Sequence, residues 1–176
     1  MMINIMPALP AHVRGIAELI EPMVAQRLLI SKDLIDYFED VQEFYVAIDG
    51  DRVVGCGALH VLWEDIAEIR TLAVSTDYQG RGVGGNLYLA LEAKAYELEL
   101  RRLFCLTFET SFFGKFGFTE IQGTPVGENV YAEMLRSHDD GMAEFLELAR
   151  VKPNTLGNTR MLKELDNPIS EGGFQS

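Results

Sequence analysis

The sequence predicts an α/β (α+β) fold, in which helices flank a sheet. Strand-like apolar runs alternate with segments whose apolar residues recur at helical spacing, and Asp49-Gly50-Asp51 marks a hairpin between two of the strands. A glycine-rich turn at 79–85 joins a third strand to a helix. The 176 residues, 48% of them hydrophobic, suffice for one domain, which we assign to 1–166. The Gly, Pro and Ser residues of 167–176 predict a flexible tail.

The individual elements follow from periodicity and from turn or cap signals. The first half predicts, in order, a strand at 3–6, a helix at 11–26, a second helix capped by Ser31, and strands at 43–48 and 52–62. The second half predicts a strand at 66–74, a helix at 83–98, a strand at 103–108, a short helix ending in Gly117-Phe118, an irregular segment around Tyr131, a helix at 141–150 and a final strand ending near Leu165.

Charge and composition exclude several classes of function. A net charge of −12 repels nucleic acid, so we expect no nucleic-acid partner. No apolar run reaches the ~20 residues that span a bilayer, and the N-terminus lacks the order of a signal peptide, so we expect a cytoplasmic protein without a membrane partner. Cys56 and Cys105 lie in apolar strand patterns, which predicts buried thiols rather than a disulfide or a metal site.

The glycine-rich turn predicts a site for a phosphorylated ligand. Glycines let backbone N–H groups converge on phosphate oxygens at the positive end of the following helix. Gly80, Gly82 and Gly85 also satisfy the G-x-G-x-x-G pattern of a dinucleotide fold. Five residues, 75–79, separate the strand from the first glycine, and about half the chain precedes the turn. Both observations disfavour a dinucleotide.

Two motifs resemble the GNAT acetyltransferase superfamily. Gln79 to Gly84 match its pyrophosphate loop, Q/R-x-x-G-x-G/A, and the strand at 103–108 leads into a helix that ends in Gly117-Phe118. The resemblance implies a GNAT fold, a mixed and mostly antiparallel sheet whose central strands splay apart. It also implies an enzyme that uses acetyl-CoA as co-substrate, needs no metal, and transfers the acetyl group by direct attack in a ternary complex.

The resemblance assigns the cofactor contacts. Backbone groups of Leu72, Ala73 and Val74 would lie along the pantetheine arm, and the Leu72 N–H would stabilise the thioester oxyanion. The residues implied for the pyrophosphate are Gln79, Gly80, Arg81, Gly82, Val83, Gly84 and Gly85.

Glu68 is the first candidate for the base that deprotonates the acceptor amine, because several relatives carry a catalytic glutamate at this position. Strand alternation would put Glu68, Arg70 and Leu72 on one face. An ion pair of Glu68 with Arg70 or Lys115 is the structural alternative. Glu109, at the end of the next strand, is the second candidate.

The sequence lacks the usual general acid. Phe113 stands where many relatives have a tyrosine that protonates the thiolate. Tyr131 is the candidate substitute, with core packing as its alternative role. A cysteine nucleophile, Cys56 or Cys105, would need a histidine such as His60 beside it.

The chain further resembles amino-acid N-acetyltransferases of the glutamate type, above all the short actinobacterial N-acetylglutamate synthases, which catalyse the first step of arginine biosynthesis. The segments that resemble them include 42–44, 56–60, 68–74, 106–110, 117–120 and 158–162. Because glutamate has two carboxylates, its pocket needs cationic donors. The acceptor-binding candidates are Lys32, Arg70, Lys115, Asn158 and Arg160.

Other acceptors and assemblies stay open at this point. The acceptor could be another amino acid such as glutamine or leucine, or a protein N-terminus or lysine. The chain could also be a non-catalytic acetyl-CoA-binding module. A homodimer is compatible with the resemblance.

Overall fold

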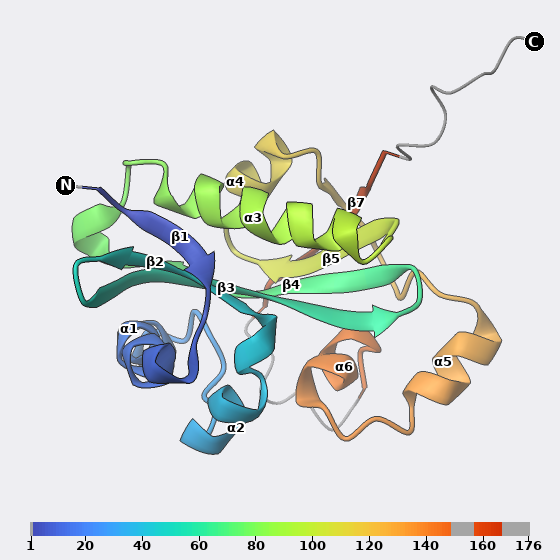
Figure 1. The fold of residues 1–176 in the computed structure, drawn as a ribbon. Coiled ribbons are helices and arrows are strands. Elements are labelled where there is room, and N and C mark those ends of the chain that lie inside the picture. Colours follow the sequence, from blue (N-terminus) through green and yellow to red (C-terminus); the bar gives the residue numbers. More distant parts are fainter. Residues whose placement is uncertain (1, 149–156, 167–176) are drawn as a thin grey trace, which may run out of the picture.

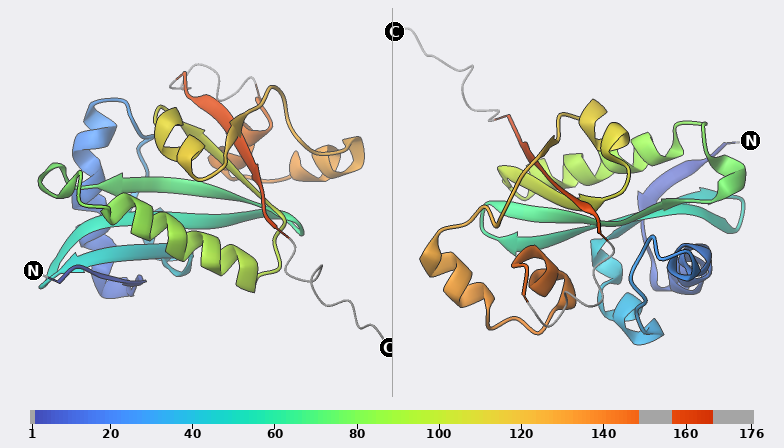
Figure 2. Two further views of the ribbon diagram at one scale, coloured as in Figure 1. Left: turned by 90° about the horizontal axis from the view of Figure 1, so that it is seen from above. Right: turned by 180° about the vertical axis from the view of Figure 1, so that it is seen from behind.

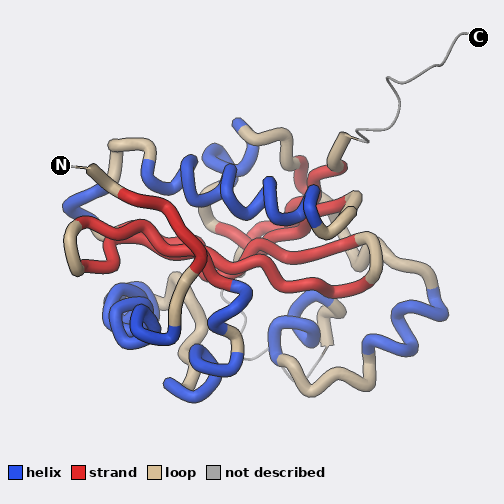
Figure 3. The backbone as a smooth tube through the Cα atoms, viewed as in Figure 1, coloured by secondary structure: helices blue, strands red, loops and turns tan. Residues whose placement is uncertain are grey.

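The structure, a computed structural model, describes residues 2–148 and 157–166. Within these ranges one seven-stranded sheet, in the order β1-β2-β3-β4-β5-β7-β6, lies between two layers of helices (Figures 1 and 3). The strands are β1 Asn4–Pro7, β2 Phe44–Asp49, β3 Arg52–Trp63, β4 Ile66–Val74, β5 Arg102–Thr107, β6 Thr119–Glu120 and β7 Thr159–Glu164. All neighbouring strands pair antiparallel except β4 and β5, which are parallel. The predicted mixed, mostly antiparallel sheet is confirmed.

The helices divide between the two faces of the sheet. The helices α3, Val83–Glu97, and α4, Thr110–Lys115, lie above the sheet in Figure 1. The helices α1, α2, α5 and α6 lie below it, with bounds Val13–Ala25, Leu34–Glu39, Glu128–Met134 and Asp140–Phe145. Three single turns of 3-10 helix, Pro10–His12, Val41–Glu43 and Thr76–Tyr78, complete the described elements. Figure 2 shows α3 running obliquely across the strands.

Three helix boundaries differ from the predictions. The second helix is capped by Asp33 rather than Ser31, because the Asp33 N–H donates to the Asp36 carboxylate in a reciprocal capping box. Tyr131 lies in the helix α5 rather than in an irregular segment. The helix α6 is six residues long and ends at Phe145, not at 150. Residues 149–156 and the predicted tail at 167–176 lie outside the described residues, so the division at 166 stays a prediction.

The splay between β4 and β5 positions the site. The two strands pair only where Ile66–Glu68 faces Arg102–Phe104, although β4 continues to Val74 and β5 to Thr107. Glu68 is therefore the last β4 residue in register with β5. Beyond it the two strands diverge, as the GNAT resemblance implied.

A β-bulge in β4 changes which side chains share a face. Arg70 pairs with Ala58 and Ala73 with Cys56, so Gly57 alone stands opposite both Thr71 and Leu72. Thr71 has φ of 54°, an unusual conformation for a β-branched residue. The extra residue shifts the alternation, so the prediction that Leu72 shares a face with Glu68 and Arg70 is wrong. Leu72 packs toward α3, where a Cβ on Gly57 would lie 2.9 Å from its Cδ1.

The hydrophobic core has separate parts on the two faces of the sheet. On the upper face, Tyr88, Leu91 and Ala95 of α3 pack with residues of β4, β5 and α4. On the lower face, α1 and α2 cover β2 and β3, whereas α5 and α6 cover the start of β4 and the middle of β5. The lower face therefore holds two separate helical groups.

Candidate active site

A cleft of about 1500 Å³ opens where β4 and β5 separate. Its walls come from α1, the end of β4, the glycine loop, the end of β5 and α4. The predicted site residues that line this cleft are Leu72, Ala73, Val74, Gln79, Gly80, Gly82, Val83, Gly84, Gly85, Glu109, Lys115 and Asn158. The fold thus brings all of the predicted cofactor residues except Arg81 into one cleft.

The glycine loop has the backbone that an anion cradle requires. Gly80 and Gly82 have φ of 76° and 77°, and Gly82 is the N-cap of α3. A Cβ on either would meet no heavy atom within 4 Å, so open space lies around them. The Arg81 guanidinium sits 5.1 Å from the centre of the Tyr78 ring, whose hydroxyl donates to Asp49. The contact with Tyr78 places the Arg81 guanidinium near the N-terminus of α3.

The bulge releases part of the β4 backbone from the sheet. Thr71 and Leu72 have no partner of their own in the β3 register, and neither pairs with β5. Both residues line the cleft. The Thr71 carbonyl accepts from the buried Cys56 thiol at 3.3 Å. Backbone at this bulge can therefore contact an extended ligand that enters between the strands.

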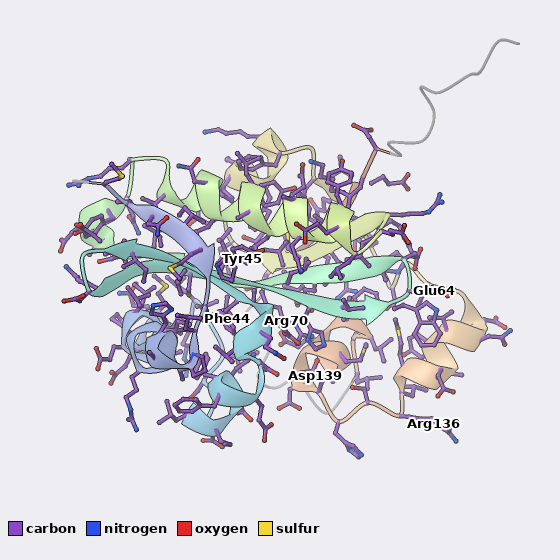
Figure 4. The ribbon with its side chains drawn as sticks, viewed as in Figure 1. Phe44, Tyr45, Glu64, Arg70, Arg136 and Asp139 are labelled. Carbon is purple, nitrogen blue, oxygen red and sulfur yellow. The ribbon has the colours of Figure 1, made fainter. Side chains whose placement is uncertain are left out.

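Glu68 is in an ion pair below the sheet, as the structural alternative anticipated. It is only 5% exposed, and Arg70 Nε donates to its Oε2 at 2.9 Å. The Arg70 fork binds both Asp139 oxygens, at 3.3 and 2.7 Å (Figure 4). Neither Glu68 nor Arg70 is among the residues that line the cleft. Glu68 nonetheless lies where β4 and β5 begin to separate, as the last β4 residue in register with β5.

The remaining acceptor candidates lie in different surroundings. Lys115 and Glu109 are exposed in the cleft, and the Asn158 Oδ1 is a buried acceptor with no hydrogen-bond partner there. Lys32 lies outside the cleft lining, 4.0 Å from Asp40. Arg160 donates to the carbonyls of Gly123, Glu144 and Phe145.

Arg160 ties β7 to the helix α6. Its four hydrogen bonds to carbonyl oxygens measure 2.6 to 3.2 Å, and its guanidinium lies 5.0 Å from the centre of the Phe104 ring. These contacts satisfy the last carbonyls of a short helix. Contact between Arg160 and an acceptor stays a prediction.

The residues considered for the acid step are packed in the core. Phe113 is buried against Tyr88 and Phe118, and the Tyr131 hydroxyl donates to the Leu146 carbonyl.

Burial raises the pKa of the Cys56 thiol to about 12 and that of Cys105 further. Raised thiol pKa values disfavour the thiolate that a cysteine nucleophile needs. Both cysteines are free.

Among residues 2–148 and 157–166, no three His, Cys, Asp or Glu side chains are grouped as metal ligands would be. No helix in the same ranges is long and apolar enough to cross a membrane.

Sequence reasoning missed Asp139 and Glu144. Asp139 could have been predicted as a helix N-cap, because aspartate is a preferred residue there. Its carboxylate accepts from the Met142 N–H at 2.7 Å. Its pairing with Arg70, 69 positions away in the chain, had no local signal. Burial, together with the nearby charge of Glu68, raises the pKa of Glu144 to about 7.

Glu144→Gln is expected to stabilise the protein at pH 8 and to change little at pH 5. The pKa of Glu144 is raised to about 7 on folding, so the native state loses stability as the pH rises from ~4.3 toward 7. Glutamine removes that loss, by about 1 kcal/mol after allowing for solvent screening. Thermal melts of both proteins at the two pH values measure the difference, and an equal gain at both would contradict the assignment.

Comparison with known proteins agrees with this geometry. The Acetyltransferase (GNAT) family matches residues 15–118. An amino-acid acetyltransferase of Mycobacterium tuberculosis is 55% identical over 141 residues, which cover 78% of this chain and 81% of the relative. The crystal structure of Rv2747 from Mycobacterium tuberculosis, in complex with CoA and NLQ, superimposes with a TM-score of 0.88 at 49% identity, covering 93% of this chain and 99% of that one.

A more distant structure shares the fold. N-acetylglutamate synthase from Neisseria gonorrhoeae, complexed with coenzyme A and N-acetyl-glutamate, has a TM-score of 0.75 at 22% identity. The match covers 95% of this chain but 36% of that one. The family match, the close relative and the cleft at the splay lead to the same assignment. The chain belongs to the GNAT acetyltransferase family and, within it, to the amino-acid acetyltransferases.

Proposed function

We propose that the chain transfers the acetyl group of acetyl-CoA to the α-amine of L-glutamate. The observation that carries the acetyl-CoA part is that one continuous cleft joins the glycine loop to the released backbone at Thr71 and Leu72. The amino-acid part is supported by the 55% identical amino-acid acetyltransferase. The glutamate part is supported by the fold shared with a synthase solved with N-acetyl-glutamate.

Acetyl-CoA is proposed to lie along the splayed end of β4. The pantetheine arm would run beside Leu72, Ala73 and Val74, and the pyrophosphate would accept hydrogen bonds from backbone N–H groups of the loop at 79–85. The Leu72 N–H would stabilise the negative charge that develops on the thioester oxygen. This residue stands in the bulge, without a β3 register partner.

Proton transfer is assigned to the two carboxylates. An α-ammonium group is mostly protonated at pH 7, so it must lose a proton before it attacks. Glu68, at the fork of the splay, is the proposed base, directly or through one water, and Glu109 in the cleft is the second candidate. The CoA thiolate leaves without a tyrosine at position 113, where Phe113 is packed among aromatic rings.

The acceptor carboxylates are proposed to be held by some of Lys32, Arg70, Lys115 and Arg160, together with Asn158. Lys115 and Asn158 line the cleft and can touch a ligand there directly. Arg70 and Arg160 already donate to protein oxygens, so we assign them positioning of the surrounding elements. Asn158 Oδ1 is free to accept from the acceptor ammonium.

The test is release of free CoA from acetyl-CoA with each of the twenty amino acids and a lysine-bearing peptide as acceptors. Glutamate is expected to give the highest kcat/KM. Faster release with an uncharged amino acid or the peptide would overturn the acceptor but leave the acetyltransferase assignment in place. Binding of acetyl-CoA without release for any acceptor would favour a non-catalytic module.

Asn158→Leu is expected to raise the KM for the amino-acid acceptor by at least tenfold and to leave the KM for acetyl-CoA within about twofold. Leucine keeps the approximate size of the side chain but removes the amide oxygen that would accept from the acceptor ammonium and the amide N–H groups that would donate to its carboxylates. Steady-state kinetics with each substrate varied in turn separates the two constants. Equal increases in both would place Asn158 in the cofactor part of the cleft.

A further inference from the structure

Arg70 divides its hydrogen bonds between two carboxylates. Its Nε donates to Glu68 Oε2 at 2.9 Å, and its two terminal nitrogens donate to Asp139 at 3.3 and 2.7 Å. The Arg70 side chain is 9% exposed and that of Glu68 7%. The geometry is a fixed fork rather than a solvated surface pair. We call Glu68, Arg70 and Asp139 the Arg70 triad.

Asp139 is itself held on several sides. Its Oδ2 accepts from the Met142 N–H at 2.7 Å as the N-cap of α6, and its own N–H donates to Ser137 Oγ at 3.2 Å. The triad therefore joins the catalytic strand β4 to the start of α6, which lies between β6 and β7 in the sequence (Figures 1 and 4).

Gly141 shows that the packing around Arg70 is tight. A Cβ at this position would lie 2.3 Å from Arg70 Nη2 and 2.5 Å from its Cζ. The first turn of α6 therefore passes directly against the Arg70 guanidinium. Because the fork is bound to two carboxylates, the guanidinium cannot move aside without breaking those bonds.

We propose that Asp139 is a positioning residue for acetyl transfer, which acts through Arg70 to orient the Glu68 carboxylate at the point where β4 and β5 separate. The inference rests on the proposed role of Glu68 as base. Without Asp139 the two terminal nitrogens of Arg70 would lose their hydrogen bonds, and the full guanidinium charge would act on the Glu68 carboxylate. With Asp139 present, the guanidinium is held in place and its charge is shared between the two carboxylates.

Other ionisable groups surround the triad and must be considered in a pH profile. His60 of β3 lies between Glu43, 2.9 Å from its Nδ1, and Asp139, 3.8 Å from its Nε2. Glu144 on α6 lies near Glu68, and its pKa is raised to about 7 chiefly by burial. Burial also raises the pKa of Asp40, which lies within electrostatic range of Arg70 and His60. The contribution of each group to the pH profile can be tested with His60→Gln, Glu144→Gln and Asp40→Asn.

The test is Asp139→Asn, because asparagine is as good an N-cap as aspartate and keeps α6 formed. We expect kcat to fall about tenfold, the KM for acetyl-CoA to stay within about twofold, and the acidic limb of the kcat/KM profile to move to lower pH. The same shift is expected in a His60→Gln background, which excludes titration of His60. An unchanged pH profile with normal kcat would overturn the proposal.

A second variant displaces Arg70 without removing a charge. Gly141→Ala puts a methyl group against the guanidinium and should also lower kcat. The control is Gly127→Ala, because a Cβ at Gly127 would have no heavy atom within 4 Å. This control variant should keep a normal kcat. Thermal melts of both variants report whether the fold is intact. Normal kcat in a folded Gly141→Ala protein would contradict the role of the Arg70 geometry.

A double variant separates this inference from the proposed function. If Asp139 acts through Glu68, Asp139→Asn should have little further effect in a Glu68→Gln background. Additive losses in the double variant would overturn the positioning role while leaving Glu68 as base. If Glu68→Gln alone has normal kcat, the proposed base is wrong, and any loss from Asp139→Asn then acts by another route, which also overturns the inference.

Discussion

Glu68→Gln is expected to lower kcat by roughly 10²-fold or more, with partial recovery at high pH. Glutamine keeps the shape and an oxygen that can accept from Arg70 Nε, so the packing at the fork of the splay should survive. The substitution removes only the ability to take a proton. Activity returns at high pH because more of the acceptor amine is then unprotonated. The pH dependence of kcat between pH 6 and 9 measures both effects.

The matched control is Glu109→Gln. Glu109 is exposed in the cleft one strand away, and its backbone N–H donates to Thr107 Oγ1. If Glu68 is the base, the Glu109 variant should keep kcat within a few-fold. A near-normal Glu68→Gln enzyme beside a strongly impaired Glu109→Gln enzyme would transfer the role to Glu109.

Gly84→Asp is expected to raise the KM for acetyl-CoA by at least tenfold while the protein stays folded. Gly84 lies in the first turn of α3, and a Cβ there would make ordinary contacts, 3.5 Å from Phe112 and 3.6 Å from Val74. The free protein can therefore accommodate a Cβ at this position. A carboxylate at this position would lie where the pyrophosphate approaches and would repel it.

Two further variants make the result specific. Gly84→Ala adds the Cβ without the charge and should have a smaller effect. Gly127→Asp places the same carboxylate at the N-cap of α5, on the opposite side of the sheet, and should leave the KM unchanged. Direct titration of CoA binding checks that KM reports affinity. Unchanged affinity in folded Gly84→Asp protein would contradict the cofactor assignment.

Much of the fold could be predicted because the signals are local. The hairpin at 49–51, the long apolar strands β3 and β4, and the glycine turn before α3 depend on residues close together in the chain. Short elements were harder to predict from the sequence. The two-residue strand β6 and the helix α5 are held mainly by contacts with β7 and the core, for which a single segment carries little periodicity.

The candidate site likewise has a part that local sequence signals predict and a part that depends on tertiary contacts. The sequence by itself determined the family, the glycine loop and the β4 residues beside it, since a phosphate cradle is built from consecutive backbone groups. Only the tertiary structure decided what the charged side chains contact. The bulge at Thr71 separated Leu72 from Glu68 and Arg70, and α6 brought Asp139 onto Arg70. The physical reason is that a one-residue insertion inverts strand alternation, and an ion pair between distant segments depends on how helices pack against the sheet.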